Sequence, residues 1–103
     1  MHVIAKAKFD EATKNFPNDV RAIDDLYRLL KKGDFKTPEE LIKAVPSLDN
    51  FKYLDKWYVI DINGSNLRLL AFIEFTNQKV FVRHILNHKQ YDKFVDAHRK
   101  GKK

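Results

Sequence analysis

The spacing of the apolar residues changes near position 56, and this change restricts the fold more than any other feature of the sequence. Before it, apolar residues recur every three or four positions, which is the period of a helix. From Trp57 onward they recur every two positions and are mostly β-branched or aromatic, as is typical of strands. Helices followed by strands indicate an α+β domain in which a helical layer packs on one face of a sheet.

The first half of the chain predicts three helices after a short strand at residues 2–5. The first helix ends before Pro17, and the second begins at Asn18 or Asp19 as its cap, so the two should form a hairpin. The third helix begins in residues 37–40, which supply an N-cap Thr, a first-turn Pro and a capping-box Glu, and it ends at Pro46. The three predicted apolar stripes are Ala5, Phe9, Ala12 and Phe16; Val20, Ile23, Tyr27 and Leu30; and Leu41, Ile42 and Val45.

The second half predicts three strands, at residues 57–62, 66–75 and 79–86, and a closing helix. The turns between the strands are short, which indicates an antiparallel meander. The closing helix should begin at Asn87 as its cap, with Gln90 as the capping-box partner. We therefore predict a single two-layer domain over residues 1–103. In its middle strand, one face carries Leu67, Leu69, Ala71, Ile73 and Phe75, and the other carries Arg68, Leu70, Phe72 and Glu74.

The net charge of +6 lies entirely in the last part of the chain. Residues 1–75 hold twelve basic and twelve acidic side chains, whereas residues 76–103 hold eight basic and two acidic ones. A positive field at one end favours a polyanion such as nucleic acid, or an acidic protein partner. The tail at 99–103 alone is more simply a solvated end, but Lys79, Arg83 and Lys89 lie within structured sequence.

Several kinds of chemistry are excluded or disfavoured by what the chain lacks. It has no cysteine, so disulfides, thiolate metal sites and cysteine nucleophiles are excluded. His84 and His88 are four residues apart but lie on either side of the predicted strand-to-helix boundary, so we expect no metal site there and no cofactor. No apolar run approaches the ~20 residues that span a bilayer, and residues 1–6 lack the apolar core of a signal peptide. These features predict a soluble cytoplasmic protein without a membrane partner.

The candidate site lies where the last predicted strand meets the closing helix. Arg68 is a charge within an otherwise apolar central strand, and Arg83 lies on the neighbouring strand. If both face away from the helical layer, their guanidinium groups converge near the first turn of the closing helix, where they would bind a phosphate. His88 and Tyr91 are three residues apart on that turn, so they can act on the same group.

Metal-free RNA cleavage needs a base for the 2′-hydroxyl, an acid for the departing 5′-oxygen and a fixed positive charge for the phosphorane. Histidine suits the proton transfers and arginine the charge, while Tyr91 can donate a hydrogen bond or stack on a base. Lys56 is a further candidate for phosphate contact or proton transfer. Simpler interpretations also exist: Arg83 could pair with Glu74 across a turn, Tyr91 could be a core residue, and His88 could be an ordinary surface residue.

The sequence also resembles HigB-type toxins of the RelE superfamily. The resemblance lies in residues 1–4, 51–59 and 81–92, in the strand that contains Arg68, and in residues 46–50 and 98–103, so it extends over essentially the whole chain. It implies a RelE-like fold, cleavage of mRNA on the translating ribosome, and neutralisation by a helix-turn-helix antitoxin of the HigA type. The toxin would therefore belong to a type II toxin–antitoxin system.

Carried over to this chain, the basic and aromatic active-site pattern of these toxins falls on Arg68, Arg83, His88 and Tyr91. Asp61 stands where close relatives are expected to have Asn, and its role is open. The main alternative is a noncatalytic RNA- or ribosome-binding inhibitor of translation, and a third possibility is an adaptor for an acidic protein. The residues expected to contact RNA are Lys56, Lys79, Lys89 and Lys93.

Overall fold

The computed structural model describes residues 1–4 and 6–101, with side chains described up to Arg99. Ala5, which was expected in the first strand and first stripe, lies outside the described residues, as do Lys102 and Lys103 of the tail. The elements, in chain order, are β1 (His2–Ile4), α1 (Lys6–Asn15), one turn of 3₁₀ helix (Pro17–Asp19), α2 (Val20–Lys32), α3 (Pro38–Ala44), β2 (Asp49–Asn50), β3 (Trp57–Ile62), β4 (Leu67–Glu74), β5 (Lys79–Asn87) and α4 (His88–Gly101).

The strands form one sheet in the order β1-β5-β4-β3-β2. The predicted meander of β3, β4 and β5 is antiparallel, and the α+β class is confirmed. The sheet is mixed, because β1 pairs in parallel with β5. Neither that pairing nor the two-residue strand β2, which pairs with β3, was predicted. Both edge strands are too short to show the two-residue alternation of a strand. Parallel strands are not joined by a tight turn, so the sequence carries no turn signal for the pairing of β1 with β5.

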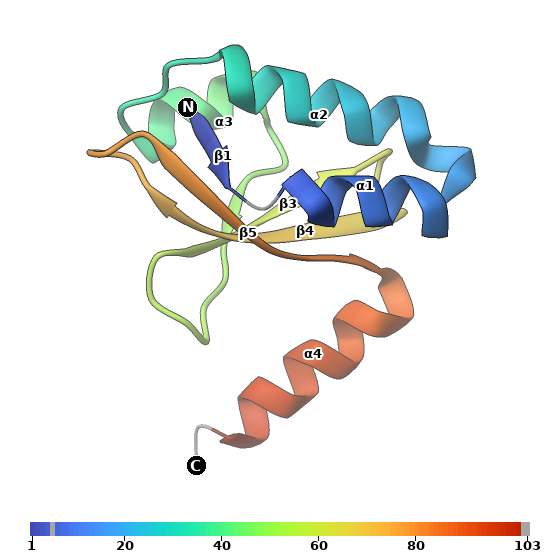
Figure 1. Ribbon diagram of the computed structural model, residues 1–103. Coiled ribbons are helices and arrows are strands. Elements are labelled where there is room, and N and C mark those ends of the chain that lie inside the picture. The colour runs from blue at the N-terminus through green and yellow to red at the C-terminus, as the bar shows by residue number, and fades with distance from the viewer. Residues whose placement is uncertain (5, 102–103) are drawn as a thin grey trace.

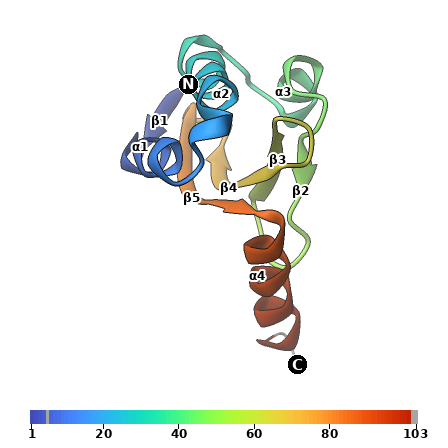
Figure 2. The ribbon, with the colours of Figure 1, turned by 90° about the vertical axis from the view of Figure 1, so that its right-hand side faces the viewer.

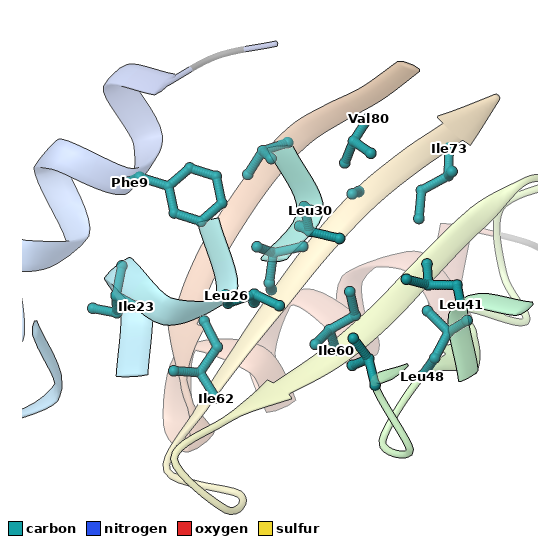
Figure 3. Close-up of a cluster of buried hydrophobic side chains, with 14 of the residues drawn as sticks. Phe9, Ile23, Leu26, Leu30, Leu41, Leu48, Ile60, Ile62, Ile73 and Val80 are labelled. Carbon is teal, nitrogen blue, oxygen red and sulfur yellow. The ribbon is translucent and has the colours of Figure 1, made fainter. Parts of the chain in front are cut away.

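Helices α1, α2 and α3 cover one face of the sheet, which we call the core face, whereas α4 extends from the opposite, outer face (Figures 1 and 2). The apolar side of β4 packs on the core face as predicted, with Leu67, Leu69, Ala71 and Ile73 nearly inaccessible. Figure 3 shows these strands meeting α1, α2 and α3 through a continuous set of buried side chains that includes Phe9, Ile23, Leu30, Leu41, Ile60 and Val80.

A second, smaller cluster lies on the outer face. Phe51, Val59 and Leu70 form its buried part, and α4 contributes Tyr91 and Phe94, with Val95 beside them. The closing helix therefore does not join the helical layer. It is attached to the sheet through its first turns, while its far end projects away from the domain (Figure 2). None of the described helices is long and apolar enough to cross a membrane.

The predicted helix starts differ in how well they match the structure. At α4, the amide of Gln90 donates to Asn87 Oδ1 over 2.8 Å and the amide of Asn87 donates to Gln90 Oε1 over 2.9 Å, so this capping box is confirmed. At α3, the Thr37 hydroxyl accepts a hydrogen bond from the Glu40 amide, as predicted for the N-cap. The Glu40 carboxylate accepts from the amide of Lys36 instead of that of Thr37, so the reciprocal bond of the predicted capping box is displaced by one residue. The helix ends at Ala44, two residues before Pro46.

Asp19 precedes α2 as predicted, but its side chain does not cap the helix. Its carboxylate is 5% exposed. It accepts hydrogen bonds from the side-chain amides of Asn63, at 2.6 Å, and Asn66, at 2.8 and 2.9 Å. Both asparagines belong to the turn between β3 and β4, so Asp19 joins the helical layer to this turn.

Candidate functional site

The hairpin of β3 and β4 places Asp61 directly opposite Arg68 on the outer face. Its turn contains Asn63 and Gly64, both with positive φ, a conformation that Gly and Asn adopt at low cost. Arg68 Nε lies 3.3 Å from Asp61 Oδ1, and both side chains are largely buried. Arg68 Nε is inaccessible to solvent but makes no hydrogen bond, so the contact is an ion pair whose N–H does not point at the oxygen.

Tyr91 packs against the same guanidinium group. The centre of its ring lies 4.7 Å from Arg68 Cζ, which is a cation–π distance. Tyr91 also contacts the second apolar cluster, so it is both a packing residue and a neighbour of Arg68. The sequence set a core role for Tyr91 against a role in the chemistry: the structure shows the packing, and the role in the chemistry stays a prediction.

His88 is the first residue of α4 and is largely exposed, with 63% of its side chain accessible. Arg68 on β4 lies opposite Leu86 on β5, and Leu86 is two residues before His88. His88 Nδ1 is 3.2 Å from Asp92 Oδ2, one helical turn away. With Nδ1 facing a carboxylate, the favoured neutral tautomer leaves Nε2 as a free acceptor.

Arg83 lies on the outer face beside an irregularity in β5. The strand register runs from Leu70 opposite His84 to Ala71 opposite Val82, so Arg83 is an extra residue in a β-bulge. Simple alternation from Leu86 would place Arg83, three residues away, on the core face. Instead, Arg83 is exposed and its guanidinium carbon lies 5.8 Å from the ring of Phe81, which is an outer-face residue.

The described residues provide no ion pair between Arg83 and Glu74, so that simpler interpretation of Arg83 is not supported. Glu74 lies opposite Lys79 instead. The structure therefore brings Arg68 and Tyr91 together, and His88 lies in the same first turn of α4 as Tyr91. Arg83 lies on the same face, further along β5.

The four candidate lysines divide into two pairs. Lys89 and Lys93 are exposed on α4 near the Arg68 end of the sheet. Lys56, with φ of 62°, lies just before β3, and Lys79 lies at the start of β5. Both are at the other end of the sheet from Arg68. At about 3.3 Å per strand residue, Lys56 is roughly 16 Å along β3 from the Asp61–Arg68 pair.

Comparison with known proteins identifies the family. A family model described as "HigB_toxin, RelE-like toxic component of a toxin-antitoxin system" matches residues 19–94. The protein named mRNA interferase HigB of Escherichia coli O6:H1 is 52% identical over 102 residues, which cover 99% of each chain. The protein named mRNA interferase toxin HigB of Escherichia coli K12 is 43% identical over 104 aligned positions that cover both chains completely. The chain belongs to the HigB toxin family. The resemblance seen in the sequence is thereby confirmed, as is the RelE-like fold.

This HigB-family chain also has an aromatic group beside the site that the sequence did not reveal. The ring of Phe94 on α4 lies 4.9 Å from His84 on β5 and 4.1 Å from His98 one turn later. The indole of Trp57 stacks on Phe94 at 6.2 Å and lies 6.5 Å from His84. This group attaches α4, and therefore His88 and Tyr91, to the sheet.

His84 is a half-buried titratable member of that aromatic group. Burial lowers the pKa of its imidazole below the ordinary value of 6.5, and nearby positive charges, that of Lys8 foremost, lower it further. His84 lies in β5 and His88 in α4, so the two do not share a helix face. Within the part of the HigB-family chain that the structure describes, no group of three or more His, Asp or Glu side chains could hold a metal ion.

Proposed function

We propose that this chain is an endoribonuclease that cuts mRNA by attack of a ribose 2′-hydroxyl on the adjacent phosphate, without a metal. One observation carries the proposal. Arg68 lies against Tyr91 beside the first turn of α4, and its terminal nitrogens make no hydrogen bond to any described residue. A guanidinium held in this way can bind two oxygens of one phosphate. The relatives named mRNA interferase support the choice of mRNA as substrate.

His88 is the residue that we assign to proton transfer. In the reaction, the 2′-oxygen forms a bond to phosphorus as the bond from phosphorus to the 5′-oxygen breaks. A base takes the 2′-hydroxyl proton, and an acid gives a proton to the 5′-oxygen. His88 is exposed to a substrate, and its Nε2 is available because Nδ1 faces Asp92. The products are a 2′,3′-cyclic phosphate and a 5′-hydroxyl.

Arg68 and Arg83 supply the fixed positive charge. Charge on the phosphorane exceeds that on the ground-state phosphate, so guanidinium groups aimed at it accelerate the reaction. Arg83 on the bulge and the pair Lys89 and Lys93 on α4 would hold nucleotides next to the cleaved one. Lys56 and Lys79 lie too far from Arg68 to touch the same phosphate, so we assign them to more distant contacts with RNA.

Cleavage on the translating ribosome and neutralisation by a HigA-like helix-turn-helix antitoxin are part of the same proposal. Membership of a family of toxin–antitoxin components supports them. The concentration of positive charge in residues 76–103 suits a site within ribosomal RNA.

The decisive experiment uses ribosomes programmed with a short mRNA and primer extension to detect new ends. The wild-type protein should produce discrete stops, and a single 2′-deoxy substitution at the cleaved nucleotide should abolish them, because the nucleophile is missing. Arg68→Ala and His88→Ala should each abolish cutting. Lys43→Ala, which removes a charge from the exposed side of α3 on the core face, should not.

Two results would contradict the proposal. Cutting at the 2′-deoxy position would exclude attack by the 2′-hydroxyl. Inhibition of translation without any new RNA ends would indicate the noncatalytic binder, which should also show a steep dependence of binding on salt.

A further inference from the structure

Asp61 has no part in the chemistry proposed above, although it lies beside the proposed phosphate site. A carboxylate at this position repels the phosphate that Arg68 would bind, so it weakens RNA binding unless it has another effect. Asp61 is one third exposed and pairs with Arg68 at 3.3 Å. The presence of a negative charge where RNA is expected to bind therefore needs a physical reason.

The position of Asp61 is fixed by its strand. Its backbone amide donates a 3.0 Å hydrogen bond to the hydroxyl of Ser47, and its cross-strand partner in the sheet is Arg68. The carboxylate thus faces the Nε edge of the guanidinium, while the ring of Tyr91 faces the same group at 4.7 Å. The end that carries the two terminal amino groups has no hydrogen-bonding partner among the described residues.

This arrangement restrains a flexible side chain. A free Arg side chain carries about 2 kcal/mol of rotamer entropy, part of which has to be lost when the guanidinium is fixed against the phosphorane in one orientation. A partner that already restrains the guanidinium reduces that loss in the transition state. A misplacement of about 1 Å in a catalytic group can cost as much as 10²-fold in rate.

We propose that Asp61 is a positioning residue for Arg68: it holds the Nε edge so that the two terminal amino groups are presented to the scissile phosphate. This inference rests on the proposed function, because it requires Arg68 to act on the RNA backbone. Asp61 itself does not touch the substrate. Its negative charge weakens ground-state RNA binding, and its benefit lies in the rate of the chemical step.

A purely electrostatic role for Asp61 predicts different behaviour. If the carboxylate only reduced the positive charge of the site, removing it would tighten RNA binding and leave the cleavage rate at saturation equal or higher. Positioning predicts that the affinity for RNA and the rate change in opposite directions. The two roles can therefore be separated by measuring both quantities on the same variants.

The experiment measures RNA affinity and the single-turnover cleavage rate at saturating protein, on ribosomes programmed with the mRNA described above. We expect Asp61→Ala to lower the saturating rate by about tenfold or more without weakening binding. Asp61→Asn should lower the rate less than Asp61→Ala does, because its amide oxygen can still face Nε although the charge of the ion pair is lost. Asp96→Ala removes a carboxylate that pairs with Arg99 on α4, and it should change neither quantity.

The outcomes distinguish the two proposals. A saturating rate for Asp61→Ala equal to that of wild type, while Arg68→Ala is inactive, overturns the role of Asp61 alone. Full activity of Arg68→Ala overturns the proposed function and this inference with it. Thermal unfolding is followed for every variant. If Asp61→Ala does not fold, Asp61→Thr replaces it, because Thr lacks the carboxylate and favours strands.

Discussion

The carboxylate of Asp19 should stabilise the fold by joining the helices to the sheet, and Asp19→Ala tests this. Asp19 is buried and accepts three hydrogen bonds from the amides of Asn63 and Asn66. Truncation removes all three. The helices would then be connected to the turn between β3 and β4 only through the apolar core.

The size of the effect follows from these contacts. Hydrogen bonds to a charged acceptor contribute about 1.5–3 kcal/mol each. The total is smaller than three such bonds, because two of them share one amide, and because Asn63 and Asn66 are exposed and can be rehydrated. Loss of a buried charge also removes its desolvation cost. We expect Asp19→Ala to lower the free energy of unfolding by roughly 2–3 kcal/mol, or the Tm by about 10–20 °C for a domain of this size.

Urea and thermal unfolding followed by circular dichroism measure this change, with two matched variants. Asp25→Ala on the exposed side of α2 should change the free energy of unfolding by less than about 0.5 kcal/mol. Asp19→Ser keeps a good N-cap residue but cannot accept three hydrogen bonds, so it should be nearly as unstable as Asp19→Ala. A Ser variant as stable as wild type would refute the reasoning, because it would mean that Asp19 acts as a helix cap after all.

Three further predictions concern the outer face. Phe94→Ala should lower the free energy of unfolding in urea by about 2–3 kcal/mol, because the ring packs against Phe51, Trp57 and His84; a loss below about 0.5 kcal/mol would contradict this packing. Because the pKa of His84 is lowered in the folded state, the unfolded chain binds more protons than the folded protein as the pH falls through 6.5, so the free energy of unfolding should decrease on acidification. His84→Gln should reduce this dependence of the free energy of unfolding on pH between about pH 7.5 and pH 5.5, and an unchanged dependence would exclude His84 as its cause. Arg83→Ala should leave the Tm nearly unchanged but reduce the salt slope of RNA binding by about one, whereas an unchanged slope would place Arg83 away from the RNA.

The parts of the fold that could be predicted from sequence are those with a local signal. The change of hydrophobic period identified the helices and the three central strands, and the capping box at Asn87 and Gln90 fixed the start of α4. The position of α4 on the outer face was not predicted. Its stripe of Tyr91, Phe94 and Val95 shows that one side is buried, but not which face of the sheet covers it.

The candidate site also shows which features a local sequence signal can predict and which it cannot. The pairing of Asp61 with Arg68 could have been deduced, because the two residues are equally distant from the turn that joins their strands. The bulge at Arg83 could not, since no Gly or Pro marks it in β5. Alternation counted from Val82 places Arg83 outward, whereas alternation counted back from Leu86 places it in the core, and the inserted residue reconciles the two counts.

The same bulge explains how one strand serves two surfaces. Before it, Val80 and Val82 contribute to the main core; after it, His84 and Leu86 face α4 while Ile85 returns to the core. A strand that kept strict alternation from Val80 would direct residue 84 toward the core and residue 83 outward. It would then place residues 85 and 87, rather than His84 and Leu86, on the side of Arg68. The extra residue thus brings the end of β5 into the register in which Leu86 lies opposite Arg68, and α4 then starts so that Tyr91 packs against the guanidinium. Deleting one residue at the bulge should therefore disrupt the contact between Arg68 and Tyr91 more than it disrupts the main core.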